Sequence, residues 1–223
     1  MQSFFDYLKT IVKLCLGYGV QKSYSQFGED VIVQTLCKEA AGTYIDVGTY
    51  HPVLYSNTYA LYKKGWSGLA IDPNPRLKPL YALLRPRDTF ISAGVGTEGT
   101  YTYYRFSDGA YNTFNAESAA AYKTLHWLRP LESIERPLIP LSKIVHDHSV
   151  QKIEFLNIDV EGNDLQVLQS YDWSVRPKII AIESIEFNPD MPHESEIYKL
   201  LHAKGYRLAG LSGVSLIWAD DNK

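Results

Sequence analysis

Two short apolar segments near the start of the chain each end in an aspartate and a turn. Asp46 opens Asp46-Val-Gly48-Thr49-Tyr50-His51-Pro52, and Asp72 follows 26 positions later (72 − 46), just before Pro73. A helix-like stretch separates the two, which predicts a β-α-β unit in a parallel sheet. Ligands of such sheets bind beyond the carboxyl ends of the strands. Gly48 would let the backbone turn and approach a ligand, and Asp72 could accept hydrogen bonds from a ribose diol.

The turn after Asp46 also indicates which class of ligand it binds. It carries one glycine, so it lacks the G-x-G-x-x-G loop of dinucleotide sites, and the chain has no Walker loop. The expected cofactor therefore has a ribose but needs no phosphate cradle, and S-adenosylmethionine meets that description. Asp46 would lie near its amino-acid end and Asp72 near its ribose hydroxyls. Alternatively, Asp72 caps the helix that follows the Pro-Asn-Pro turn.

Further carboxylates stand at the end of a later apolar segment, residues 153–158. Asp159 and Glu161 are two apart, so on a strand they would face the same side about 7 Å from each other. Methyl transfer to an alcohol needs a general base, and we expect Glu161 in that role with Asp159 nearer the sulfonium. His51 could orient the acceptor hydroxyl, act as an alternative base, or be a turn residue without function. Alternatively, Glu161 and the following glycine only begin the next helix.

A metal ion is a further possibility at this edge. Glu183 ends the neighbouring apolar segment, so Asp159 and Glu183 could together hold Mg²⁺ or Mn²⁺, which would acidify the acceptor hydroxyl. No residue is assigned as a metal ligand on this ground alone. His146 and His148 form an H-x-H pair without a nearby third ligand, which favours a solvated loop.

The order of the elements predicts one α/β domain. Strands alternate with helices and a hairpin ends the chain, which indicates a doubly wound, mostly parallel sheet with one reversed strand. The expected strands are residues 43–47, 68–72, 89–95, 99–106, 153–158, 178–183, 206–211 and 215–219. The expected helices are residues 25–37, 56–64, 77–84, 164–170 and a segment around 197–201.

Two segments stand apart from this pattern. Residues 1–22 contain apolar side chains at helical spacing and predict an amphipathic helix, packed on the body, on a second copy or on a membrane surface. Residues 23–223 would form the catalytic domain. Within it, residues 107–140 are irregular and rich in aromatic side chains, which is typical of a loop-plus-helix cover over a cleft or of an ordinary packed insertion.

Composition excludes several classes of protein. The 223 residues are 45% hydrophobic and 21% charged, as in globular domains, and the net charge of −3 argues against a nucleic-acid partner. Residues 4–16 are too short and too charged to span a bilayer and lack the flanks of a signal peptide. Two cysteines without metal or disulfide spacing are typical of a protein of the reducing cytoplasm.

Taken in order, these segments resemble the FkbM methyltransferases over about residues 25–220. The resemblance rests on Ser25-Gln26-Phe27-Gly28-Glu29-Asp30, Asp46-Val47-Gly48 with His51-Pro52, Ser56-Asn57-Thr58, Gly65-Trp66-Ser67-Gly68, Ile71-Asp72-Pro73-Asn74-Pro75 and Asn157-Ile158-Asp159-Val160-Glu161-Gly162. The resemblance implies a class I, Rossmann-like methyltransferase fold with a seven-stranded sheet, and a reaction that transfers a methyl group from S-adenosylmethionine to a hydroxyl.

The resemblance also implies roles for particular residues. Asp46, Gly48, Thr49, Asp72 and Asp159 would contact the cofactor, and Gln26, Ser92 and Ala93 would lie near it. The chain departs from the family at Thr49-Tyr50, where Ala is common at the first position, so the contact with the methionine end is less certain there. Family members often modify sugars of glycans, polysaccharides or glycolipids, so a sugar hydroxyl is the expected acceptor.

Two other classes of function are considered. Tyr59-Ala-Leu-Tyr-Lys63 matches the Y-x-x-x-K of short-chain dehydrogenases, which would make the protein an NAD-dependent sugar oxidoreductase, but the match directly follows the first strand instead of lying deep in the chain. A non-catalytic module that binds a partner or a membrane through residues 1–22 is the third reading.

Overall fold

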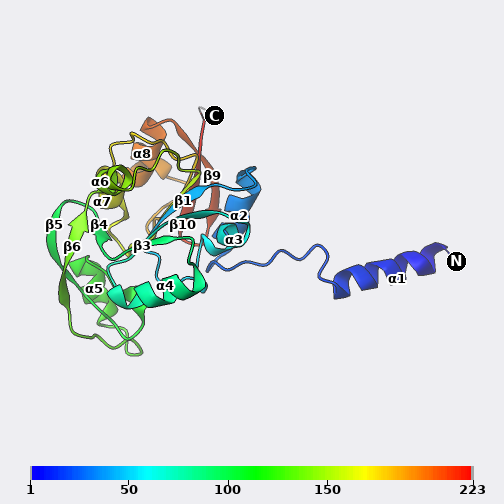
Figure 1. Ribbon diagram of the computed structural model, residues 1–223, viewed down its shortest axis with the longest axis horizontal. Helices are drawn as coiled ribbons and strands as arrows, with labels where there is room; N and C mark the ends of the chain where they lie inside the picture. Colours follow the sequence, from blue (N-terminus) through cyan, green and yellow to red (C-terminus); the bar gives the residue numbers. More distant parts are fainter. Residues whose placement is uncertain (1, 222–223) are drawn as a thin grey trace.

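The computed structural model describes residues 2–221, so the outermost ends of the expected segments 1–22 and 23–223 lie outside the described residues (Figure 1). Seven strands form the main sheet in the order β3-β2-β1-β7-β8-β10-β9. Their bounds are β1 (Thr43–Val47), β2 (Ser67–Ile71), β3 (Thr89–Ile91), β7 (Phe155–Ile158), β8 (Ile179–Glu183), β9 (Tyr206–Ser212) and β10 (Ser215–Asp220). Only β10 runs antiparallel to its neighbours, so the expected mostly parallel seven-stranded sheet with a terminal hairpin is confirmed.

Helices cover both faces of the sheet. On one face, α2 (Glu29–Leu36) and α3 (Tyr59–Lys63) pack against strand residues such as Tyr44 and Phe155. On the other face, α6 (Leu141–Asp147), α7 (Asp164–Gln169) and α8 (Glu196–Ala203) pack against Ile45 and its neighbours. Because alternate strand residues point to opposite faces, the central strands are apolar throughout. α4 (Lys78–Leu84) lies against β3 at the edge and follows the 3₁₀ turn η1 (Pro75–Leu77).

Strand register determines what meets at the ligand edge. Val47 aligns with Ile71 on one side and with Ile158 on the other, and Ile158 aligns with Ile182. The residues that follow these four along their strands are Gly48, Asp72, Asp159 and Glu183. The carboxyl ends of β1, β2, β7 and β8 therefore form one row that carries three carboxylates and a glycine.

The helix after the first 22 residues begins later than expected. Residues 25–28 do not belong to it, because Gly28 has φ 90° and precedes the first helical residue, Glu29. The side chain of Asp30 explains the shape of the segment before it. Its oxygens accept hydrogen bonds from the Oγ atoms of Ser23 and Ser25 and from the Tyr24 amide. Residues 25–28 therefore form a turn before the helix, and hydrogen bonds from residues 23–25 to Asp30 hold this segment in place.

A second sheet lies where continuous strands and a loop were expected. It has the order β4-β6-β5, with β4 (Gly94–Val95), β5 (Gly99–Tyr103) and β6 (Ile134–Ile139). The expected strand 89–95 is therefore wrong as one element: its first part joins the main sheet, and residues 94–95 pair with β6. Residues 99–106 do not extend the main sheet either, because β5 ends at Tyr103 and pairs antiparallel with β6.

The segment 107–140 combines several short elements. It contains the 3₁₀ turn η2 (Gly109–Tyr111), α5 (Ala116–Tyr122) and β6, whereas the sequence indicated no strand there. Pro137 in the middle of β6 conceals the strand in the sequence, because proline cannot donate a ladder hydrogen bond. A third 3₁₀ turn, η3 (Pro192–Glu194), precedes α8.

The two histidines expected on a solvated loop belong to a helix. His146 lies in the last turn of α6 and His148 is at its C-cap. The imidazole of His146 is 90% exposed, and neither histidine belongs to a cluster of potential metal ligands among residues 2–221. The pair therefore lies at the end of a helix and not on a loop.

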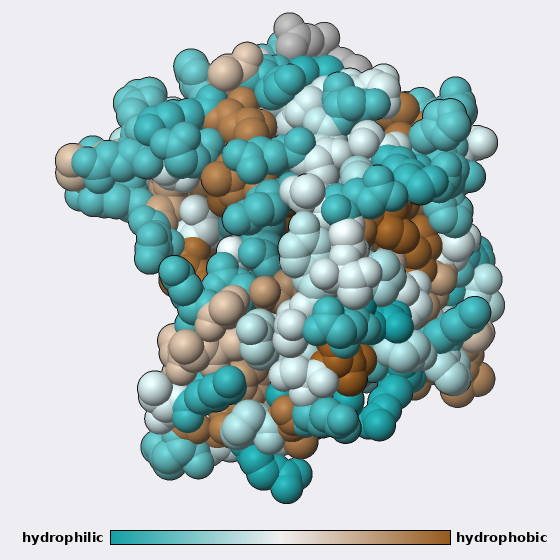
Figure 2. All heavy atoms as spheres, turned by 90° about the vertical axis from the view of Figure 1, so that its left-hand side faces the viewer, coloured by the Kyte–Doolittle hydropathy of each residue, from teal (hydrophilic) through white to brown (hydrophobic). Residues whose placement is uncertain are grey.

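The N-terminal helix α1 (Gln2–Cys15) projects away from the body of the protein, as Figure 1 shows. Its apolar side chains face solvent, with Phe4 67% and Leu14 63% exposed. The side of the molecule farthest from α1 instead carries small, separate hydrophobic patches among hydrophilic residues (Figure 2). Within the described chain, no helix combines the length and the apolar character needed to span a membrane.

Candidate cofactor and acceptor site

A cavity of about 240 Å³ opens at the carboxyl ends of β1, β2, β7 and β8. Most residues expected at the site line it: Gln26, Asp46, Gly48, Thr49, Asp72, Ala93, Asp159, Glu161 and Glu183. Two expected residues, His51 and Ser92, are not among the lining residues. The parallel sheet thus brings together segments separated by more than a hundred positions.

Asp46 is buried, and its carboxylate is held by three side chains. Oδ2 accepts hydrogen bonds from the hydroxyls of Thr58 at 2.5 Å and Thr49 at 3.1 Å. Oδ1 accepts one from Asn157 Nδ2 at 2.9 Å, and Asn57 Nδ2 donates to Asn157 Oδ1. A carboxylate offers about four acceptor positions, so about one remains for a ligand. The Ser-Asn-Thr segment before α3 therefore supports this carboxylate, a role that sequence analysis did not assign.

Gly48 permits the close approach of two loops. Its φ is 82°, and a Cβ placed on it would lie 1.5 Å from the backbone oxygen of Asp159. No side chain fits there, whatever ligand is bound. The glycine expected to approach a cofactor therefore also lets the turn after β1 pack directly against the turn after β7.

Asp72 lies at the end of β2 and faces the cavity. Its Oδ1 accepts a hydrogen bond from the Asn74 amide at 2.7 Å, and its Oδ2 accepts one from the Tyr50 amide at 3.2 Å. The side chain binds amides of the two turns but does not cap the following helix, because Asn74 is the N-cap of η1, and Asp72 lines the cavity. Burial raises the pKa of Asp72 from 3.8 to about 7, and the two amides lower it only in part. Hydroxyl donors from a ligand would favour its charged form.

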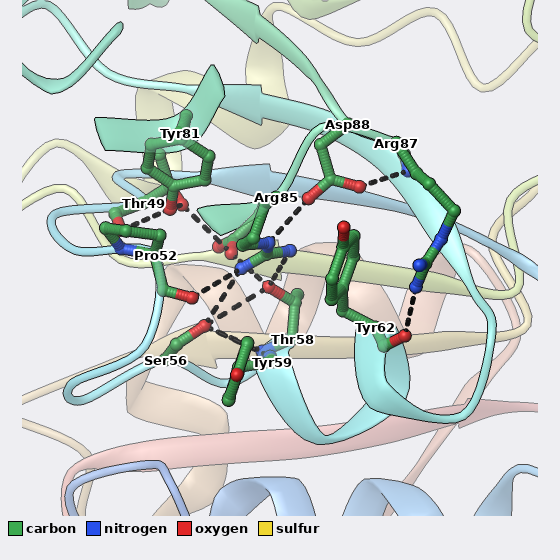
Figure 3. A network of polar contacts seen from close by, with 12 residues as sticks. Thr49, Pro52, Ser56, Thr58, Tyr59, Tyr62, Tyr81, Arg85, Arg87 and Asp88 are labelled. Atoms are coloured by element: carbon green, nitrogen blue, oxygen red, sulfur yellow. Dashed lines mark hydrogen bonds and ion pairs between the residues drawn. The ribbon is translucent and has the colours of Figure 1, made fainter. Parts of the chain in front are cut away.

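A buried arginine holds the turn after β1 from behind (Figure 3). The guanidinium of Arg85 forms an ion pair with Asp88 at 2.6 Å. It also donates to the carbonyl of Pro52 and to the hydroxyls of Ser56 and Thr58. Because the Thr58 hydroxyl in turn donates to the Asp46 carboxylate, this ion pair fixes the wall of the cavity through one intermediate residue. The position of Arg85 just after the helix expected over residues 77–84 gave no indication of these contacts.

Glu161 occupies a tight turn after β7 and not a continued strand. The strand ends at Ile158, and Glu161 has φ 57°, so the expected 7 Å spacing of strand neighbours does not apply. Asp164 accepts hydrogen bonds from the amides of Val160 and Gly162 and thereby closes the turn. α7 begins only at Asp164, so Glu161 and Gly162 do not begin that helix, and Glu161 lines the cavity.

Residues of the segment 107–140 form hydrogen bonds to the turn after β7. The hydroxyl of Tyr122, at the end of α5, donates a short hydrogen bond to Glu161 Oε2. The hydroxyl of Thr113 donates to the Glu161 carbonyl at 2.8 Å, and Asn115 Nδ2 donates to the Gly162 carbonyl at 3.1 Å. Residues 108–114 line the cavity. This part of the segment 107–140 therefore forms one wall of the cavity.

Three carboxylates converge inside the cavity. Asp159, Glu161 and Glu183 each present an oxygen, and these oxygens all lie within 4.8 Å of one another. Burial, and then repulsion by neighbouring carboxylates, raises the pKa of Asp159 well above its ordinary value and that of Glu183 to about 10. Burial also raises the pKa of Glu161, while the Tyr122 hydroxyl lowers it in part. Such crowding marks a functional site, because it is costly in the folded protein.

The charge of the cavity is one-sided. Its lining residues include the acids Glu29, Asp46, Asp72, Asp108, Asp159, Glu161 and Glu183, and none of the described lining residues is Lys, Arg or His. Glu29 and Asp108 were not expected there: Glu29 was interpreted only as a favourable residue in the first turn of a helix. This lining favours a ligand that carries positive charge.

His51 and Ser92 have other partners. His51 Nδ1 accepts hydrogen bonds from the amides of Val53 and Leu54, so the imidazole shapes the turn after β1. Burial lowers the pKa of His51. The carbonyl and hydroxyl of Ser92 accept hydrogen bonds from Arg136 of β6, which turns this residue toward the second sheet. Neither residue is among the described residues that line the cavity, although Ala93, the neighbour of Ser92, is.

The cavity geometry agrees with a comparison against families of known proteins. Residues 46–208, well over half of the chain, match the model of the methyltransferase FkbM domain. The chain belongs to the FkbM methyltransferase family. A search of curated proteins gave no match.

The match to the FkbM domain begins at Asp46, within β1, and ends at Leu208, within β9, so it contains β2, β3, β7, β8 and the second sheet in full. It also contains most of the residues that line the acidic cavity. The protein is therefore a methyltransferase with a Rossmann-like fold. Tyr59 and Lys63, the pair that resembles a dehydrogenase motif, lie at the two ends of α3 outside the cavity lining. The Lys63 ammonium instead donates to the hydroxyl of Tyr24. Among the described residues, the dehydrogenase-like pair therefore lies apart from the cavity.

Proposed function

We propose that this FkbM methyltransferase transfers the methyl group of S-adenosylmethionine to a hydroxyl of a sugar. The observation that carries the proposal is the convergence, in one cavity, of Asp72, the turn at Asp46–Gly48 and the acidic residue Glu161. Asp72 is suited to bind a ribose, and the turn at Asp46–Gly48 is suited to bind a cationic amino acid. Glu161 is suited to bind an alcohol. Asp159 stands between them.

The cofactor is supported by charge and by the shape of the turn after β1. S-adenosylmethionine carries a sulfonium and an ammonium, which match a cavity lined by carboxylates without basic side chains. Asp72 would accept hydrogen bonds from the ribose hydroxyls, and Asp46 has acceptor capacity left for the amino-acid end. Gln26, Thr49 and Ala93 belong to the same lining, so they are proposed as contacts of the cofactor.

Glu161 is proposed as the general base. The oxygen of the acceptor hydroxyl attacks the methyl carbon, the carbon–sulfur bond breaks, and its electron pair neutralises the sulfonium as a thioether. The hydroxyl proton passes to the Glu161 carboxylate. A base works best when its pKa lies near the working pH, and burial shifts the pKa of Glu161 upward in that direction. His51 is not proposed as a base, because its Nδ1 already accepts two backbone hydrogen bonds.

A sugar acceptor is supported by the aromatic wall on the cover side. The ring of Tyr111 lies edge-on to the rings of Tyr122 at 5.1 Å and of Trp127 at 5.2 Å. Tyr50 and Tyr55 stack at 6.4 Å beside the same cavity. Sugar rings combine apolar C–H faces with hydroxyls, so aromatic faces next to carboxylates suit both parts of such a ligand.

The remaining expectations are retained as proposals. We place the reaction in the cytoplasm, where free Cys15 and Cys37 would stay reduced. Glycan, polysaccharide or glycolipid intermediates are the proposed acceptors, and nucleic acid is not a proposed partner, since the cavity repels phosphate. α1 is proposed as the contact to a membrane surface or a second copy, because its apolar side chains are exposed.

The test is incubation with labelled S-adenosylmethionine and a panel of glycans. We expect label in one glycan class and stoichiometric binding of the cofactor by calorimetry. The Glu161→Gln variant should bind the cofactor normally and lose turnover by roughly 10²–10⁴-fold, the usual contribution of a general base. Glu117→Gln, an exposed change on α5, is the matched control and should keep full turnover. Unchanged turnover in Glu161→Gln would remove it from the role of base, and failure to bind S-adenosylmethionine would overturn the proposal as a whole.

A further inference from the structure

The arrangement of acids after β7 and β8 has more negative charge than the proposed cofactor can balance. S-adenosylmethionine has one sulfonium, one ammonium and one carboxylate, so its net charge is a single positive unit. Seven carboxylic acids line the cavity, and three of them, Asp159, Glu161 and Glu183, bring their oxygens within 4.8 Å. Holding three ionised carboxylates so close together in a partly buried site requires a compensating cation.

Glu183 gives independent evidence for a missing ligand. The residue is only 9% exposed, at the end of a strand that is buried throughout. Its Oε2 is buried and has no hydrogen-bond partner within the described part of the protein. Asp46 and Asp72, by contrast, accept hydrogen bonds on both of their oxygens. A buried acceptor without a partner costs free energy, so a carboxylate in this state beside two others indicates a ligand that binds oxygen.

We propose that Asp159, Glu161 and Glu183 form a site for one divalent cation of the Mg²⁺ class. Hard divalent ions take oxygen ligands at about 2.0–2.6 Å, so oxygens on one ion lie within about twice that distance of one another, as they do here. Each of the three residues supplies one oxygen, and the other coordination positions remain for water and for an acceptor hydroxyl. An organic cation needs no such convergence of single oxygen atoms.

The backbone around the three ligands is suited to hold them still. Asp159 extends the pairing of β7, since its amide donates to the Val47 carbonyl at 3.0 Å. Glu183 is the last residue of β8, and the turn that carries Glu161 is closed by Asp164 and fastened by Tyr122. Ligands on strand ends are positioned more precisely than ligands on free loops.

The role of the ion rests on the proposed function, but its binding does not. An acceptor hydroxyl bound to the cation would lose its proton more readily, and the Glu161 carboxylate would take that proton on a lone pair used neither by the ion nor by the hydrogen bond from Tyr122. Methyl transfer would then depend on both the ion and Glu161. The affinity for the ion alone can be measured without cofactor or acceptor.

The experiment titrates Mn²⁺ into the full chain after treatment with chelator and dialysis, without S-adenosylmethionine, and follows the loss of the free Mn²⁺ signal by electron paramagnetic resonance. We expect one bound ion per chain, displaced by excess Mg²⁺, with affinity that falls as the pH is lowered. Glu183→Gln and Asp159→Asn should each weaken binding by about tenfold or more, as loss of a direct ligand should exceed the effect of second-shell changes. Glu117→Gln should bind as the unaltered chain does.

Far-UV circular dichroism and calorimetry with S-adenosylmethionine accompany each variant. A variant that keeps its circular dichroism spectrum but loses Mn²⁺ supports the site. Absence of stoichiometric Mn²⁺ binding, or equal binding by Glu183→Gln, would overturn the metal site. If S-adenosylmethionine still binds in that case, the proposed function stands without a metal, so the two failures are distinguishable.

Discussion

Replacing Asp72 by asparagine should reverse the order of stability of the two proteins as the pH is raised. Burial raises the pKa of Asp72 from 3.8 to about 7, so the folded protein binds a proton more tightly than the unfolded chain. Below the pKa of the unfolded state, such a carboxyl group does not lower the free energy of unfolding. As the pH rises from that value to the pKa of the folded state, the group lowers the free energy of unfolding more and more. The free energy of unfolding should therefore fall between about pH 4 and pH 7 and stay level above that.

The magnitude follows from the same shift. One pKa unit corresponds to about 1.4 kcal/mol, so a rise from 3.8 to about 7 costs about 4 kcal/mol at pH 8. An asparagine does not ionise, so Asp72→Asn does not have this cost. Its side chain has one oxygen, however, and cannot accept hydrogen bonds from both backbone amides, those of Asn74 and Tyr50. One backbone amide is then left buried without an acceptor, which costs about 2 kcal/mol at pH 8 and at pH 4 alike. Asp72→Asn should thus be more stable by about 2 kcal/mol at pH 8 and less stable by about 2 kcal/mol at pH 4.

Urea denaturation of both proteins from pH 4 to pH 8.5, in the absence of cofactor, would measure this difference. Above about pH 4, the unaltered protein loses about 1.4 kcal/mol of stability per pH unit, whereas Asp72→Asn does not. This loss equals the cost of the missing hydrogen bond near pH 5, so the two curves of unfolding free energy against pH should cross there. Asp30→Asn is the matched control, because Asp30 is buried outside the cavity and its carboxylate accepts three hydrogen bonds. That variant should be less stable across the range. Parallel curves for Asp72→Asn, without a crossing, would refute the reasoning.

Other perturbations have equally definite outcomes. Arg85→Met should lower the free energy of unfolding by about 3–5 kcal/mol, because it leaves Asp88 as an unpaired buried charge, and a change below 1 kcal/mol by urea denaturation would contradict this. Gly48→Ala should prevent native packing of the turn, since its Cβ would lie 1.5 Å from the backbone oxygen of Asp159, and native-like cofactor affinity in that variant would show that the turn can move. Deleting residues 1–22 should leave the melting temperature of the body unchanged, because α1 projects from it, while abolishing any association with vesicles or second copies that the full chain shows in flotation and sedimentation. A large drop in melting temperature would mean that α1 packs on the body.

The sheet could be predicted because each strand can be recognised from its own residues. Central strands buried on both faces are apolar runs, and the acids Asp72, Asp159 and Glu183 stand at or just after their ends. Parallel strands align their carboxyl ends, so the convergence of these acids follows from the chain order alone. The order β3-β2-β1-β7-β8 places them side by side.

Contacts between distant segments could not be predicted in this way. Arg85 binds groups 27 to 41 positions away, and no local pattern distinguishes it from an exposed arginine at a helix end. The break at Ser92-Ala93, which sends the chain into a second sheet, depends on pairing with β6 more than forty positions later. Glu161 was expected at the ligand edge because strand residues two apart face the same side. It does lie there, but a turn after β7, and not strand alternation, directs it into the cavity.

The Arg85 ion pair has a consequence for the dynamics of the empty site. The turn after β1 is fastened to Arg85 through Pro52, Ser56 and Thr58 whether or not a ligand is present. A loop that is already ordered loses little conformational entropy when it meets its ligand, so more of the interaction energy remains as affinity. Backbone amides of residues 48–58 that bond within the protein should then exchange slowly with deuterium in the unliganded state. Ligand binding would slow exchange mainly on the cover side, in residues 108–114, where the cavity wall lies outside the sheet.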